Sequence, residues 1–137
     1  MAFWLLKSEP VKYSWEQMRR DGRTHWDGVR NHQAAANLRA MRLGDQAFFY
    51  HSNAGLEIVG IVEIVREFYV DAADPGGKFG NVDVRALAPL LQPVTLKAMK
   101  ADPLLSGMAL VRQSRLSVCP VSEAEWREIC RQGGVAA

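Results

Sequence analysis

The sequence predicts an α+β fold in which about five strands form a small closed or nearly closed barrel flanked by short helices. The first observation is a stretch rich in β-branched and aromatic residues, from 46 to 70, interrupted by Asn53-Ala54-Gly55. The second is a pair of helix-capping patterns, at Ser14–Gln17 and Ser122–Glu125, on either side of that stretch. The third is a length of 137 residues, 48% of them hydrophobic, which predicts a single domain spanning 1–137.

The first fifty residues predict one strand and two helices. Phe3–Leu6 is a short apolar run typical of a buried strand, and Trp15–Arg20 follows the first capping pattern. Gln33–Leu43 has helical periodicity, with Gly44 as its stop. Its predicted buried face comprises Ala34, Leu38 and Met41.

The middle of the chain predicts three strands. Gln46–Ser52 and Ile58–Val70 are separated by the turn at residues 53–55, and Asp71–Asn81 is a Gly/Pro-rich loop. Alternating apolar residues from Val82 to Leu90 predict a further half-buried strand.

The last third predicts a short helix, more β structure and a terminal helix. Pro93–Lys100 is the short helix, with Thr95 as its cap, and Leu110–Val118 contains one or two strands. The terminal helix begins at the second capping pattern and ends at Gly133-Gly134.

Composition favours a soluble, cytoplasmic protein. No apolar run approaches the roughly 20 residues that span a bilayer, and the N-terminal residues lack a signal-peptide pattern. Cys119 and Cys130 form neither a CxxC pair nor a zinc framework, so we expect two idle thiols.

Positive charge is concentrated in the first part of the chain. Residues 1–50 carry eight Lys/Arg against five Asp/Glu, whereas residues 51–137 carry nine against ten. Such a basic region is either a surface that attracts a polyanion or an ordinary solvated face. The arginines concerned are Arg19, Arg20, Arg23, Arg30, Arg39 and Arg42.

The sequence contains no recognisable catalytic or metal-binding signature. The three histidines, His25, His32 and His51, lack metal-ligand spacing, and no serine lies in a G-x-S-x-G motif. The glycines at 76, 77 and 80 are not followed by a Walker lysine. We therefore predict no catalytic residue, metal or cofactor.

The segment from Trp26 to Arg42 instead has the residue types of a base-binding site. Trp26 offers a stacking plane, Asn31 and Gln33 offer polar edges, and Arg30 and the later arginines match phosphates. The alternative is that Trp26 belongs to the core and Asn31 only caps a helix.

Five motifs closely resemble the EVE domain family, which includes the thymocyte nuclear protein 1-like proteins. The resemblance covers essentially the whole chain, in order. The motifs are WLLKSEP (Trp4–Pro10), YSW (Tyr13–Trp15), WDGVRN (Trp26–Asn31), FFYHS (Phe48–Ser52) and ALVRQSRLSVCPV (Ala109–Val121).

This resemblance implies a PUA-like fold, related to that of YTH domains, and recognition of a modified base in DNA or RNA. It implies Trp26 as the stacking wall, with Phe79 as a candidate second wall and His32 as a further contact. Ala35-Ala36 replaces an arginine–asparagine pair usual in the family. The implied polar pocket residues are Lys7, Ser8, Glu9, Asn31 and Ser52.

The prediction is thus a non-catalytic reader of a modified base, whose partner is a nucleic acid. Two alternatives stay open: an enzyme acting on a modified nucleotide or base, with Glu9 or Asp27 as general base, and a small-molecule or protein adaptor. The predicted contacts to the nucleic-acid backbone are Arg19, Arg20, Arg30, Arg39 and Arg42.

Overall fold

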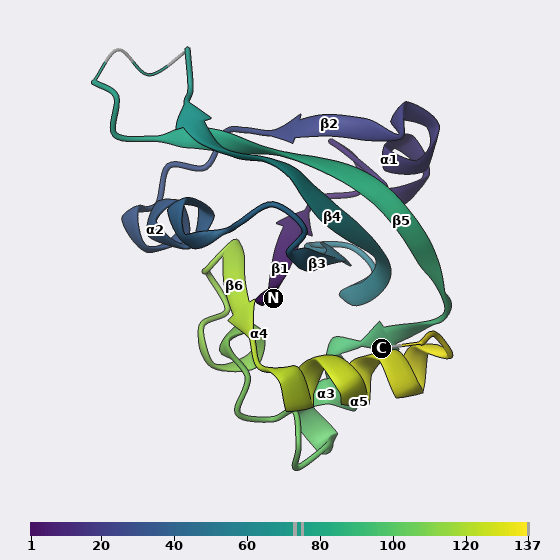
Figure 1. Cartoon of the computed structure of the whole chain (residues 1–137). Helices are drawn as coiled ribbons and strands as arrows, with labels where there is room; N and C mark the ends of the chain where they lie inside the picture. Colours follow the sequence, from purple (N-terminus) through teal and green to yellow (C-terminus); the bar gives the residue numbers. More distant parts are fainter. Residues whose placement is uncertain (73, 75, 137) are drawn as a thin grey trace.

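The computed structural model describes residues 1–72, 74 and 76–136. It contains a single six-stranded sheet and five helices (Figure 1). The loop predicted at Asp71–Asn81 includes positions 73 and 75, which lie outside the described residues. The strands are β1 (Phe3–Ser8), β2 (Arg23–Trp26), β3 (Gln46–His51), β4 (Glu57–Val70), β5 (Gly80–Thr95) and β6 (Val118–Val121).

The sheet is open, so the closed or nearly closed barrel that the sequence predicted is not confirmed. Its strand order is β2-β5-β4-β3-β1-β6, which leaves β2 and β6 at the two edges. The helix α2 (His32–Ala40) contacts both β5 and β6. This helix therefore bridges the edge strand β6 and β5, the neighbour of the other edge strand, across the concave side of the curved sheet (Figure 1).

Four of the described helices begin at a residue whose side chain caps the helix. Side chains of Ser14, Asn31, Thr95 and Ser122 each accept a hydrogen bond from the backbone N–H three residues later. The backbone N–H of Ser122 donates in return to the Glu125 carboxylate, which completes a capping box. The remaining helices are α1 (Trp15–Asp21), α3 (Leu96–Ala101), α4 (Ala109–Arg112) and α5 (Glu123–Gly133).

The sequence misassigned two segments and overextended two helices. The short helix predicted at Pro93–Lys100 begins only at Leu96, because Pro93–Thr95 still belong to β5. Leu110–Val118 was predicted as strand, but its first part is helix α4 and β6 begins only at Val118. The four-residue edge strand β2 was not predicted, because Arg23–Trp26 is too short and polar to show clear alternation. Helix α2 ends at Ala40 rather than Leu43, since Met41 is extended.

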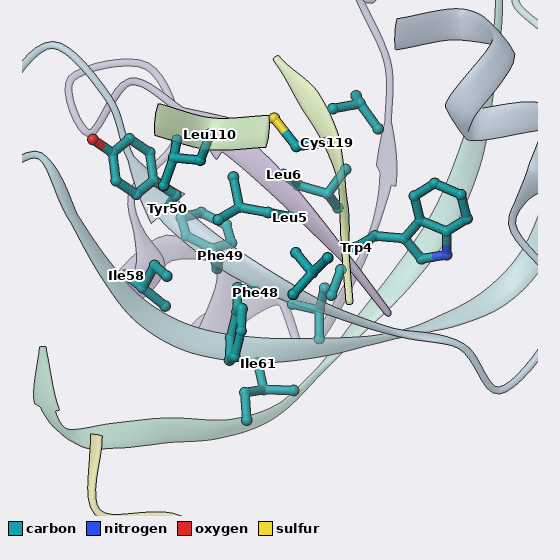
Figure 2. Close-up of a cluster of buried hydrophobic side chains, with 14 of the residues drawn as sticks. Trp4, Leu5, Leu6, Phe48, Phe49, Tyr50, Ile58, Ile61, Leu110 and Cys119 are labelled. Atoms are coloured by element: carbon teal, nitrogen blue, oxygen red, sulfur yellow. The ribbon is translucent and has the colours of Figure 1, made fainter. Parts of the chain in front are cut away.

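Aromatic rings link the sheet to α5. Phe48 stacks on Trp126 with ring centroids 3.9 Å apart, and Phe3 stacks on the same indole at 4.4 Å. Figure 2 shows the neighbouring layer, in which Leu5 and Leu6 of β1 lie among the aromatic residues of β3. The apolar face of the amphipathic helix α5 is thereby buried against the sheet.

Both cysteines are buried free thiols. Burial raises the pKa of Cys119 and of Cys130 to about 11, so neither thiol is appreciably ionised at neutral pH. None of the described helices is long and apolar enough to cross a membrane.

Candidate nucleic-acid interface

A cavity of about 630 Å³ lies where the carboxyl end of β1 meets β2 and the turn after β3. This volume is within the usual range for a small-ligand pocket. Five predicted site residues line it: Lys7, Ser8, Glu9, Trp26 and Ser52. Nine further residues complete the lining: Lys12, Tyr13, Thr24, His25, Asp27, Asn53, Ser114, Arg115 and Ser117.

Three predicted ligand-binding residues are not brought to this cavity: Asn31, His32 and Phe79. The side-chain oxygen of Asn31 accepts from the backbone N–H of Ala34 at 2.9 Å, which is the helix-capping alternative. His32 and Phe79 contact each other elsewhere. Ala35 is buried within the core face of α2 and also lies outside the cavity lining.

Trp26 belongs to the core and to the cavity wall at once. Only 8% of the residue is exposed, and its ring meets Phe49 edge-on at 5.5 Å and Tyr13 edge-on at 6.4 Å. The two interpretations of Trp26 drawn from the sequence are therefore compatible. The core contacts fix the ring, and what remains accessible of it lines the cavity.

Lys7 supplies a positively charged group from the end of β1. Its Nζ donates to the carbonyl oxygen of Ser114 at 2.9 Å, and its backbone N–H donates to Ser117 at 3.0 Å. Burial lowers the pKa of Lys7. The segment 114–117 is thus held against β1, although it lies more than 100 residues away in sequence.

Hydrogen bonds fix the part of the cavity wall that Ser8, Tyr13 and Ser52 form. The Ser8 hydroxyl donates to the Tyr13 carbonyl at 2.6 Å, and the Ser52 N–H donates to the Ser8 carbonyl at 2.9 Å. The Tyr13 hydroxyl donates to Asp21 at 2.8 Å, and burial raises the pKa of Tyr13 to about 12. This framework joins β1, α1 and the turn after β3.

Both candidate general bases line the cavity, and both have partners. Glu9 forms an ion pair with Lys12 at 3.0 Å and accepts from the Asn53 side chain. Asp27 lies 3.4 Å from His25, with more than half of each side chain exposed. Among the residues described, no three His, Cys, Asp or Glu side chains form a group that could hold a metal ion.

His51, at the end of β3, accepts from the backbone N–H of Trp15 through Nε2 at 3.1 Å. A nitrogen that accepts cannot carry a proton, so this contact requires neutral imidazole. Burial lowers the pKa of His51 from 6.5, and Glu57 opposes this effect more weakly.

The free energy of unfolding is therefore expected to fall as the pH drops from about 8 to about 5.5. Because the folded-state pKa lies below 6.5, the unfolded chain binds more protons in this window, which favours unfolding. Urea unfolding at several pH values measures the slope. In His51→Gln, whose amide oxygen accepts without titrating, the slope should be smaller; an equal slope would contradict this role.

A second group of polar and aromatic side chains lies on or just before α2 and in the loop between β4 and β5. The His32 and Phe79 ring centroids are 5.2 Å apart at 37°, and the Arg30 guanidinium carbon lies 5.5 Å from the Phe79 centroid. Arg39 donates to the Lys78 carbonyl. These five residues are called the α2–loop cluster.

The arginines predicted to contact a nucleic-acid backbone form two separate groups. Arg19 and Arg20 are exposed on α1, while Arg30, Arg39 and Arg42 lie in or beside α2. Figure 1 shows α1 and α2 at opposite ends of β2. The positive charge that the sequence placed in one region is therefore divided between the two ends of this strand.

Comparison with known proteins identifies relatives along the whole chain. A model of the EVE domain family matches residues 2–132. Thymocyte nuclear protein 1 of Gallus gallus is 38% identical over an alignment that covers 90% of this chain and 65% of the chicken protein. The chain thus spans about two thirds of that relative's length.

Solved structures show the same fold. Protein Atu2648 from Agrobacterium tumefaciens is 50% identical, with a TM-score of 0.95 over 99% of this chain and 95% of that one. Human THYN1 in complex with 5-methylcytosine-containing DNA is 32% identical, with a TM-score of 0.91 over 100% of both chains. A YTH domain of Zygosaccharomyces rouxii MRB1 shares the fold alone, at 19% identity and a TM-score of 0.59 over 96% of this chain and 86% of that one.

The comparisons correct the predicted localisation. The sequence pattern favoured the cytoplasm, but the chicken, human and rat relatives carry the name thymocyte nuclear protein 1, which points to the nucleus. The composition of a globular domain does not distinguish these compartments, which is why composition gave the wrong answer.

Proposed function

The chain belongs to the EVE domain family, and on this premise we propose that it recognises a modified base in a nucleic acid without catalysing a reaction. One observation carries the proposal: human THYN1, whose chain in the solved structure matches this fold throughout, is seen in complex with 5-methylcytosine-containing DNA. The cavity beside Trp26 offers a place for such a base.

The residues of the cavity suit a nucleobase. Trp26 provides a wall for stacking, which contributes roughly 1–3 kcal/mol per base. Lys7 donates to acceptors on the base edge, while the hydroxyls of Ser8 and Ser52 supply neutral polar contacts. The core contacts of Trp26 support this role, because a wall that is already fixed loses no side-chain freedom on binding.

Exposed cations at both ends of β2 are proposed to contact phosphates. Arg19 and Arg20 on α1, and Arg42 after α2, are exposed at these positions. Each phosphate contact releases counterions, so affinity should fall linearly with the logarithm of salt concentration, with a slope near −0.7 per contact on a single strand. Fluorescence anisotropy at three salt concentrations measures that slope.

A panel of labelled oligonucleotides tests the proposal. It contains DNA with cytosine or 5-methylcytosine and RNA with adenine or N6-methyladenine, and we expect tighter binding to a modified member than to its unmodified counterpart. Equal affinity for each modified and unmodified pair would contradict modified-base recognition.

Trp26→Ala is unsuitable as the test variant, because removing a core indole costs about 3–5 kcal/mol of stability. Ser114→Trp is preferable, since Ser114 is exposed and its new ring would fill the cavity mouth. We expect at least about a ten-fold loss of affinity. Ser106→Trp, at an exposed serine outside the cavity lining, is the matched control and should bind like wild type.

The enzymatic alternative is tested with the same substrates. Glu9 and Asp27 line the cavity, but their carboxylates are engaged with Lys12 and His25, which favours structural roles. Mass spectrometry of the oligonucleotides after long incubation should show no change in mass. A product whose formation is lost in Glu9→Gln would establish the enzyme instead.

A further inference from the structure

We propose that the α2–loop cluster is a second nucleotide subsite, which binds a nucleotide flanking the one held in the cavity. The proposal rests on the function proposed above and adds a separate site with its own residues. The cluster, Arg30, His32, Arg39, Lys78 and Phe79, lies outside the cavity lining.

The cluster combines two aromatic rings with three cations. A nucleic-acid strand likewise offers bases that stack on rings and phosphates that attract cations. The rings of His32 and Phe79 are tilted rather than parallel, His32 is exposed and Phe79 is half-buried, so ring surface stays accessible for stacking. The Arg30 side chain is 44% exposed beside them. An acidic peptide would use the cations alone, so the accessible rings favour a nucleotide.

The backbone of residues 76–79 is held by hydrogen bonds to Asp74. The Asp74 carboxylate accepts the backbone N–H groups of Gly76, Lys78 and Phe79 at 2.8–3.1 Å. These bonds, that of Phe79 first, lower the pKa of Asp74. Such anchoring reduces the entropy that binding would otherwise cost.

Three contacts connect the cluster to its surroundings. The Arg30 guanidinium, just before α2, lies 3.0 Å from Asp71. Arg39, in the last turn of α2, donates to the carbonyl of Lys78, and its guanidinium carbon lies 4.7 Å from the ring centroid of Phe68 in β4. Lys78 and Phe79 therefore contact residues at both ends of α2, Arg39 in its last turn and His32 in its first.

Two short segments of the chain link the cluster to the cavity lining. Asp27 lines the cavity, and Arg30 follows it by three residues. On the neighbouring strand, Val82 pairs with Trp26, and Phe79 precedes Val82 by three residues. Three residues of chain span at most about 10 Å, which is about three nucleotide steps of a B-form strand. A strand whose base enters the cavity therefore has flanking nucleotides within reach of the cluster.

The test compares a single-stranded DNA nonamer containing one central 5-methylcytosine with free 5-methyl-2′-deoxycytidine. We expect Phe79→Leu and His32→Ala each to weaken nonamer binding at least about five-fold, the lower range for loss of one stacking ring. Both variants should bind the free nucleoside with wild-type affinity, because the nucleoside occupies only the cavity. Ser114→Trp should weaken both ligands.

Ala40→Ser is the matched control, because Ala40 is exposed on α2 and lies outside both the cluster and the cavity lining. It should leave both affinities unchanged, and thermal melting confirms that each variant is folded. Unchanged nonamer affinity in Phe79→Leu and His32→Ala, with wild-type binding intact, would overturn the second subsite alone. A wild-type protein that binds neither ligand would overturn this subsite together with the proposed recognition of 5-methylcytosine.

Discussion

Gly60→Ala should lower the free energy of unfolding by about 3 kcal/mol, near the upper end of the usual cost of overpacking a core. A Cβ atom at Gly60 would lie 2.4 Å from Cζ2 of Trp15, a contact too short for either group to tolerate. The indole cannot simply retreat, because it is 6% exposed and packs against Phe49 at 5.4 Å.

Urea unfolding of wild type and variant measures this loss. Gly107→Ala is the control, since the nearest side-chain atom there would be 3.8 Å from the new Cβ, and its effect should stay within about 1 kcal/mol of wild type. A double variant, Gly60→Ala with Trp15→Leu, should recover part of the loss relative to the sum of the single changes. Full additivity would show that Trp15 is not the source of the strain.

The same substitution should also affect binding. Trp15 contacts Phe49, and Phe49 contacts Trp26, so the three rings form a chain from the core to the cavity wall. Displacement of Trp15 by Gly60→Ala is therefore expected to weaken oligonucleotide binding under conditions where the variant remains folded.

Asp45→Ala should destabilise the protein by about 3 kcal/mol. The residue is 4% exposed, and its carboxylate accepts from the Trp4 indole N–H at 3.1 Å and from the backbone N–H groups of Arg42 and Ala2 at 3.0 and 3.1 Å. Alanine would leave the buried indole N–H without its partner, which costs about 1–3 kcal/mol in addition to the lost charge-assisted bonds.

Asp45→Asn distinguishes hydrogen bonding from side-chain size. One Asp45 oxygen accepts from both Trp4 and Arg42, and an amide oxygen in its place would keep those two bonds and lose that to Ala2. About half the destabilisation of Asp45→Ala is therefore expected in urea unfolding. Asp27→Ala, at an exposed carboxylate, is the control; a similar loss there would contradict the role of burial.

The sequence predicted those helices and strands that are determined by residues close together in the chain. Capping by Ser14, Thr95 and Ser122 depends on atoms three residues apart, and helix and strand periodicity depends on one face of one element. Strand β2 was missed because its pairing with β5 is made by residues about 60 positions away. The open sheet likewise depends on how α2 packs against β5 and β6, which no local pattern encodes.

The candidate site was predicted in part for the same reason. Lys7, Ser8 and Trp26 lie in motifs that carry the family resemblance, and the structure brings them to one cavity. Ser114 and Ser117 lie in the last of those motifs, but only the contact with Lys7 explains their presence in the lining. His32 and Phe79 were assigned to the same pocket, and their separation from it became visible only in three dimensions.

The position of β1 within the sheet has a consequence for synthesis on the ribosome. This strand pairs with β3 on one side and with β6 on the other, and Phe3 is opposite Val121. At about 5–20 residues per second, the second partner is made roughly 6–24 s after the first residues of the strand. During that interval one edge of β1 has no strand to pair with, so this edge is where a nascent chain is most exposed to wrong pairing.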